Sequence, residues 1–184
     1  EDDMVGMYTH ATFNLNPRAS SRLKIRFRAS AADDLLRALA RRHGVESFIE
    51  LAPAVSYREA LAEMMRADAL LILQASNCNR QVPAKLYEYL RSGRPIVCLS
   101  DRCGDTWQTL ERAGLSRMAD LCRSEDIAHL LRDLLSDEPA AVEGLLPRSD
   151  AVAAASRRNR TAELVEVLQQ CASMRDLERN HAHA

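Results

Sequence analysis

The chain has 184 residues, of which 47 % are hydrophobic and 28 % charged, proportions that are ordinary for a globular protein with one full core. Its net charge of −1 excludes a general electrostatic attraction to nucleic acid or to anionic membranes. No apolar run approaches the roughly 18 residues of a membrane span and no signal-peptide pattern is present, so we predict a cytoplasmic protein without a transmembrane segment.

The five cysteines indicate reduced thiols rather than a disulfide framework. Their number is odd, and no pair has the C-x-x-C spacing of a zinc or redox site. Cys78 lies in a polar stretch without a nucleophile motif, and we assign it no catalytic role. We predict no metal site.

Two strands are expected near the start of the chain. The β-prone stretch 4–13 forms the first and the alternating stretch 23–28 (LKIRFR) the second, with a turn-rich segment between them. A parallel crossover with its own helix needs a dozen or more residues, and only about ten are present. Either the two strands are antiparallel, or a helix of the usual crossover is missing.

A helix, a short strand and a second helix follow. The composition of 31–42 is helical, and 46–51 (ESFIEL) has the pattern of a strand. Ser56, with Glu59 three residues later, forms a capping-box signature, which predicts a helix over 57–66.

The centre of the chain is predicted to form one βαβ unit. The apolar run 69–73 suits a strand buried on both faces, and 96–99 is a second such run. Between them the polar loop 75–82 leads into a helix that begins at Pro83. Ligands bind at the carboxyl ends of parallel strands, and free N–H groups at a helix N-terminus attract anions. The loop and the first helical turn therefore form the candidate binding site.

Lys85 and Glu88 are the candidate functional residues of this helix. On a helical wheel they lie opposite Leu86, Tyr87 and Leu90, which we expect to pack on the sheet. The helix dipole disfavours a lysine in the first turn, so Lys85 indicates an anionic partner. Only two of the 25 basic residues are lysines, which favours a specific role for this one. The alternative is a solvated (i, i+3) ion pair with Glu88.

The rest of the chain is predicted to be mainly helical. Helices are expected over 105–113, over 124–135, in a short segment after residue 137 and in a long segment from residue 150, with a weak strand over 117–121. The basic run 157–160 fits a solvated helix face, so we predict no nucleic-acid binding.

These elements predict an α/β fold with a Rossmann-like parallel sheet flanked by helices. We expect residues 1–148 to form this domain and residues 149–184 to form a C-terminal helix with a frayed tail.

Four segments in order, VSYREAL, ADALLILQ, VPAKLYEYLRSGRPIV and GDT, resemble the donor-binding C-terminal domain of GT-B glycosyltransferases of the group 1 (family 4) type. The late SRRNRTAELVEVL segment is similar to the closing helix of that domain. The resemblance implies one half of a GT-B fold that binds a nucleoside-diphosphate sugar as donor substrate. It implies sugar transfer with retention to an unidentified acceptor, with no cofactor and no metal held by the protein.

The resemblance also implies roles for individual residues. Glu88 matches the glutamate that binds the ribose hydroxyls, and Val55 and Ser56 border the base. Lys85 and Arg80 are the candidate catalytic cations, which would stabilise the departing nucleoside diphosphate. The stretch that holds the diphosphate comprises Val82, Pro83, Ala84 and Lys85.

Three features differ from the family pattern. Arg80 stands eight positions before Glu88, where many members have a second glutamate. The arginine and lysine that follow the family's first strand are not recognisable, and Arg18 is only a loose substitute. The N-terminal acceptor domain is missing from this chain, so we expect donor binding with little transfer. The alternative function is a degenerate or partial Rossmann-like domain that binds a nucleotide or a protein without turnover.

Overall fold

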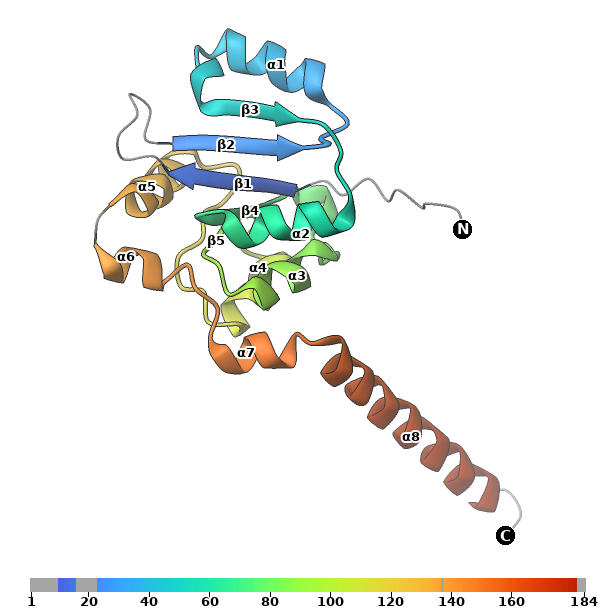
Figure 1. The fold of residues 1–184 in the computed structure, drawn as a ribbon. Coiled ribbons are helices and arrows are strands. Elements are labelled where there is room, and N and C mark those ends of the chain that lie inside the picture. Colours follow the sequence, from blue (N-terminus) through green and yellow to red (C-terminus); the bar gives the residue numbers. More distant parts are fainter. Residues whose placement is uncertain (1–9, 16–22, 137, 182–184) are drawn as a thin grey trace.

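The computed structural model describes residues 10–15, 23–136 and 138–181. They form an α/β structure with one five-stranded mixed sheet in the order β3-β2-β1-β4-β5 (Figure 1). The strands are β1 His10–Leu15, β2 Leu23–Arg28, β3 Ile49–Ala52, β4 Ala69–Gln74 and β5 Ile96–Ser100. The helices are α1 Asp33–Arg42, α2 Tyr57–Arg66, α3 Lys85–Ser92, α4 Asp105–Arg112, α5 Ser124–Leu135, α6 Pro139–Glu143, α7 Ser149–Ala154 and α8 Arg157–His181.

The strand β1 runs antiparallel to both of its neighbours, β2 and β4. This decides between the two alternatives for the first strands: they pair as antiparallel neighbours, and the connection between them needs no crossover. The sheet is therefore mixed, whereas a Rossmann-like parallel sheet was predicted. Parallel pairing is confined to β2 with β3 and to β4 with β5. Residues 4–9 of the expected first strand, Arg18 and the end of the tail lie outside the described residues.

Helices cover both faces of the β4–β5 pair, and each strand contributes alternate residues to the two sides. Leu70 and Ile72 belong to a core with α2, α3 and α4, whereas Ala69 and Leu71 face a second core with α5. All four side chains are at most 3 % exposed. The prediction of a strand buried on both faces is confirmed.

The prediction about the packed face of α3 was right but incomplete. Leu86 and Leu90 are buried as expected and half-buried Tyr87 packs against the same core, but the fully buried aromatic residue of the helix is Tyr89, which was not predicted. Each helical residue is rotated by about 100° from the last, so Tyr89 lies closer to Leu86 around the axis than Tyr87 does. Tyr87 is half-buried and faces a neighbouring cleft.

The β2–β3 pair packs on α2 partly through charges. Glu63 of α2 accepts hydrogen bonds from Arg26 Nη1 at 3.1 Å and from Arg28 Nε at 3.0 Å, and Arg26 also pairs with Glu50 at 3.0 Å. Burial acts to lower the pKa of Arg26, but the hydrogen bonds and charges of Glu50 and Glu63 outweigh it and raise that pKa above its ordinary value. These four side chains join β2 and β3 to α2.

The C-terminal segment forms two helices where one was predicted. The short helix α7 ends at Ala154, and Ser156 caps α8 by accepting a 3.3 Å hydrogen bond from the backbone N–H of Asn159. Ala155, between the two helices, is buried in the core that contains α3, and α8 then projects away from the sheet (Figure 1). The division at residues 148 and 149 stays a prediction. Within the described ranges, no helix is long and apolar enough to cross a membrane.

Buried and exposed cysteines should differ in reactivity. We expect an alkylating reagent at pH 8 to modify Cys103, Cys122 and Cys171, which are exposed, and to spare Cys98, which has no exposed surface. Burial also raises the pKa of the Cys98 thiol to about 11, although a hydrogen bond to Ser100 partly opposes this, so little of the reactive thiolate forms. Peptide mass spectrometry would measure the modification, with urea-unfolded chain as the control. Equal labelling of Cys98 and Cys103 in the native chain would contradict the buried position of β5.

Candidate functional site

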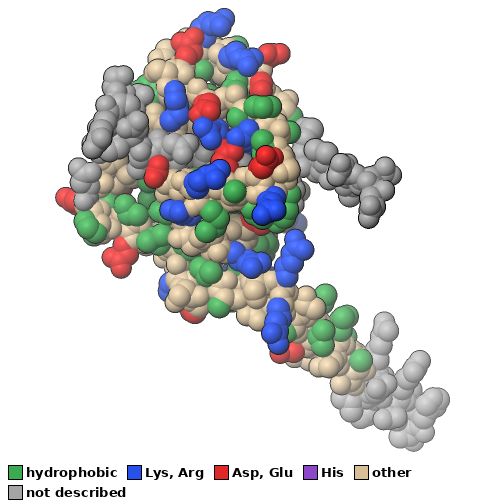
Figure 2. Space-filling view, in the orientation of Figure 1, with side chains coloured by type: hydrophobic (Ala, Val, Ile, Leu, Met, Phe, Trp, Pro, Cys, Tyr) green, Lys and Arg blue, Asp and Glu red, His purple; other side chains and the backbone are tan. Residues whose placement is uncertain are grey.

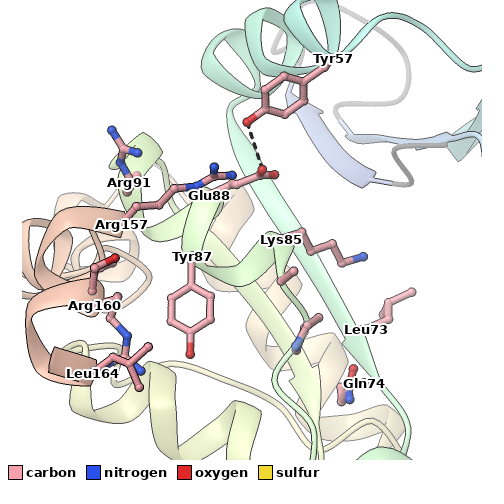
Figure 3. Close-up of a pocket in the computed structure, with 14 residues that line it drawn as sticks. Tyr57, Leu73, Gln74, Lys85, Tyr87, Glu88, Arg91, Arg157, Arg160 and Leu164 are labelled. Carbon is pink, nitrogen blue, oxygen red and sulfur yellow. Dashed lines mark hydrogen bonds between the residues drawn. The ribbon is translucent and has the colours of Figure 1, made fainter. Parts of the chain in front are cut away.

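A cleft of about 1210 Å³ lies between α3 and the start of α8, at the carboxyl end of β4 (Figure 3). The strand contributes Leu73 and Gln74, and the helix that follows contributes its first turn and one exposed face. The cleft thus occupies the place where the βαβ pattern predicts a ligand. The lining residues are Tyr57, Leu73, Gln74, Pro83, Ala84, Lys85, Tyr87, Glu88, Arg91, Ala155, Arg157, Arg160, Thr161 and Leu164.

The loop between β4 and α3 is held by hydrogen bonds to the end of β4, to the loop after β5 and to the start of α4. Gln74 Nε2 donates to the carbonyl of Cys78 at 3.0 Å, and the buried hydroxyl of Thr106 donates to the carbonyl of Gln81 at 3.0 Å. Asn79 Nδ2 donates to Asp101 at 2.8 Å, and this bond, with a backbone N–H, lowers the pKa of Asp101. The loop that leads into α3 is therefore positioned by Gln74 at the end of β4, by Asp101 just after β5 and by Thr106 in the first turn of α4.

The start of α3 faces the cleft without a side-chain cap. The chain adopts a helical conformation at Ala84, and the backbone N–H of Leu86 donates to the carbonyl of Pro83 at 2.9 Å. The N-cap residue, Ala84, provides no side-chain hydrogen bond to this end of the helix. An uncapped helix N-terminus combines N–H donors with the positive end of the helix dipole, so it can bind an anion.

Lys85, in the first turn, is half-buried against the cleft, and this burial lowers its pKa. The alternative of a solvated pair with Glu88 does not occur: among the described residues no carboxylate lies within ion-pair distance of the Lys85 ammonium group. Desolvation without a counter-charge costs free energy, which an anionic ligand would recover.

Glu88 lines the cleft one turn after Lys85 and contacts Tyr57 of α2. The Tyr57 hydroxyl donates to Glu88 Oε1 at 3.2 Å, and Figure 3 shows the two side chains pointing toward each other across the cleft. Carboxylate oxygens each accept more than one hydrogen bond, so Glu88 retains capacity for hydroxyl donors of a ligand.

The structure does not gather all the predicted site residues in the cleft. Pro83, Ala84, Lys85 and Glu88 line it, but Val82 packs against the core beneath α3. Neither Arg80, which is exposed, nor Val55 is among the lining residues. The Ser56 hydroxyl is used in the capping box, where it donates to Glu59 Oε2 at 2.7 Å and accepts from the Glu59 backbone N–H.

Three arginines of the cleft were not identified from the sequence. Arg91 comes from the last turn of α3, and Arg157 and Arg160 come from the first turn of α8. Basic side chains gather where α8 leaves the rest of the chain (Figure 2). The pattern 157–160 was interpreted as a solvated face, and nothing in it indicated that α8 would begin beside α3. In the part of the chain that the structure describes, no group of three or more His, Cys, Asp or Glu side chains is placed to hold a metal ion.

Comparison with protein-family models, curated proteins and solved structures finds no match to this chain. The function is therefore argued from the residues and geometry of the cleft.

Proposed function

We propose that this chain is the donor-binding domain of a retaining GT-B glycosyltransferase and that the cleft binds the nucleoside diphosphate of a sugar donor. One observation carries the proposal. A desolvated lysine without a counter-charge lies at the uncapped start of α3, in a cleft at the carboxyl end of a parallel strand. That arrangement suits the binding of a diphosphate.

Different residues of the cleft would bind the diphosphate, the ribose and the base of such a donor. Lys85, through its ammonium group and its backbone N–H, would bind the diphosphate and stabilise the negative charge that develops as the nucleoside diphosphate leaves. Glu88 would accept hydrogen bonds from the two ribose hydroxyls. Tyr57 lies beyond Glu88 on the side of α2, where its ring can contact the base. Arg80 would contact the diphosphate only if a movement of its loop brought it into the cleft.

A binding module without turnover is the second candidate, and the position of Arg80 favours it. The residue eight positions before Glu88 is exposed and does not line the cleft, so no second acidic contact to a sugar is present there. A chain of this kind would bind a nucleoside diphosphate and its sugar conjugate equally well. The donor domain of an enzyme would bind the conjugate with additional contacts to the sugar.

Thermal unfolding with UDP, GDP, TDP and ADP and their sugar conjugates tests the proposal. We expect one nucleotide to stabilise the chain, by about 2.7 kcal/mol at 100 times its dissociation constant. Glu88→Ala should keep the unliganded melting temperature and lose the shift. Lys85→Met should melt at the same or a higher temperature without ligand, since it removes a desolvated charge, and should also lose the shift.

Glu111→Ala is the matched control, because Glu111 is an exposed glutamate of α4 that does not line the cleft. It should retain the full ligand-induced shift. The proposal is wrong if no nucleotide stabilises the parent chain, or if the shift survives in both cleft variants. If Glu88→Ala is unfolded without ligand, Glu88 has a structural role and its assignment to the nucleotide site is wrong.

A further inference from the structure

The first residue of α2, Tyr57, is held in place by the capping box before it. The Ser56 hydroxyl accepts a 3.3 Å hydrogen bond from the backbone N–H of Glu59, and Glu59 Oε2 accepts a 3.0 Å hydrogen bond from the backbone N–H of Ser56. These reciprocal bonds fix the first turn of the helix. They therefore fix the backbone from which the Tyr57 side chain extends along the cleft.

The Tyr57 hydroxyl reaches across the cleft to the Glu88 carboxylate. It donates to Glu88 Oε1 at 3.2 Å, although the two residues are 31 positions apart and lie on different helices (Figure 3). Tyr57 is 42 % exposed, so its ring adds little to the core. The position of this side chain therefore serves the cleft more than the packing of α2.

Arg157 of α8 also points toward the Glu88 carboxylate (Figure 3). In the described part of the chain it does not come within ion-pair distance of that carboxylate, so the hydrogen bond from Tyr57 is the contact that sets the direction of Glu88. A glutamate side chain without such a contact rotates about three torsions and loses that freedom when it binds a ligand. A carboxylate that is already held in one direction avoids this loss.

A carboxylate held in this way matches the two neighbouring hydroxyls of a ribose. Each carboxylate oxygen accepts two hydrogen bonds, so Oε1 can accept one from Tyr57 and one from the ligand, while Oε2 accepts one from the other ribose hydroxyl. A 2′-deoxyribose has only one of these hydroxyls. Sites built to bond a hydroxyl reject the analogue that lacks it, because a polar group of the protein is then left without its partner.

We propose that Tyr57 is a positioning residue: its hydroxyl holds Glu88 so that the cleft selects ribonucleoside diphosphates over 2′-deoxyribonucleoside diphosphates. The sugar donor is then a ribonucleotide conjugate, and TDP, whose pentose is a deoxyribose, is not its nucleotide. This inference rests on the proposed function, because it requires a nucleoside diphosphate in the cleft.

Calorimetric titration with UDP, GDP and ADP, each beside its 2′-deoxy form, tests this selection. The parent chain should bind the ribose form of one base at least about tenfold more tightly than its deoxy form. Tyr57→Phe keeps the ring and removes the hydroxyl. It should keep the unliganded melting temperature and lower this ratio at least about threefold, mainly by weakening the binding of the ribose form. A purely structural effect would weaken both forms equally and leave the ratio unchanged.

Tyr87→Phe is the matched control. Tyr87 lines the same cleft, but its side chain points away from Glu88, and the centre of its ring lies 5.7 Å from the Arg160 guanidinium (Figure 3). This variant should keep the full ratio. Glu88→Gln tests whether Tyr57 acts through Glu88: adding Tyr57→Phe to Glu88→Gln should not lower the ratio further.

The proposal is overturned if Tyr57→Phe keeps the ratio of the parent, or if Tyr87→Phe loses as much of it. A further fall of the ratio in the double variant would show that Tyr57 acts independently of Glu88, and would also overturn it. If the parent binds a ribonucleotide and its deoxy form equally, or is stabilised by TDP alone, the donor-domain function stands and the selection for ribose fails. If no nucleotide of either kind binds, both fail.

Discussion

Glu63→Ala is expected to lower the free energy of unfolding by about 3 kcal/mol, because it removes the carboxylate shared by two arginines. Glu63 and Arg28 are 12 % and 11 % exposed, so water can replace the lost hydrogen bonds only in part. Arg26 would also lose a 3.1 Å hydrogen bond on the same side of β2. The positive charges of the two arginines would then repel each other beneath α2. Urea unfolding followed by circular dichroism would measure the change.

Glu50→Ala is the matched control within the same network. Glu50 is 38 % exposed, and among the described residues its ion pair is with Arg26, at 3.0 Å, so its removal should cost less than about 1 kcal/mol. The parent chain should be the most stable, Glu50→Ala slightly less stable and Glu63→Ala the least stable of the three. If the two variants unfold at the same urea concentration, solvent screens the network and the packing of α2 on the sheet must depend on apolar contacts instead.

Leu70→Ala should lower the free energy of unfolding by a similar amount, about 3 kcal/mol, through the cavity that it leaves. Leu70 is fully buried in the core between β4 and the helices α2, α3 and α4. The same core supports Leu86, which anchors α3, so loss of packing there should also disturb the start of the helix. The variant should therefore bind the stabilising nucleotide less tightly as well as unfold more easily.

Leu73→Ala tests the same substitution three residues later in the same strand. Leu73 is 41 % exposed and lines the cleft, so its truncation creates no buried cavity and should cost at most about 1 kcal/mol. Denaturant unfolding of the two variants side by side gives the comparison. An equal loss of stability would mean that the cleft wall at Leu73 is packed more tightly than its exposure indicates.

Short-range signals predicted much of the secondary structure. The capping box of Ser56 and Glu59 is present, and the helix after it spans Tyr57–Arg66 as expected. The helix Ser124–Leu135 and the two apolar strands of the βαβ unit also lie at the predicted positions. Weak signals were less reliable: the expected strand 117–121 forms only a single bridge, between Ala119 and Leu99. Capping and periodic burial depend on residues within a few positions, which is why the sequence alone predicts them.

Local sequence pattern also predicted the part of the candidate site at the beginning of α3. Pro83 and Lys85 both line the cleft, but the helix predicted to begin at Pro83 begins two residues later, at Lys85, with Ala84 at its N-cap. The position of Glu88 follows from Lys85 by helical periodicity. Tyr57 could not be paired with Glu88 in this way, since the two residues are 31 positions apart and meet only because α2 packs beside α3.

The sequence by itself thus determined most of the helices, the buried strands and the position of Lys85 and Glu88 on one face of α3. Only the tertiary structure decided the antiparallel direction of β1, the full burial of Tyr89 beside the half-buried Tyr87, the break between α7 and α8, and the arrival of the α8 arginines in the cleft. The physical reason is the range of the contacts involved. Strand direction, the relative burial of two tyrosines and the meeting of α3 with α8 depend on packing between residues distant in sequence, which no local pattern encodes.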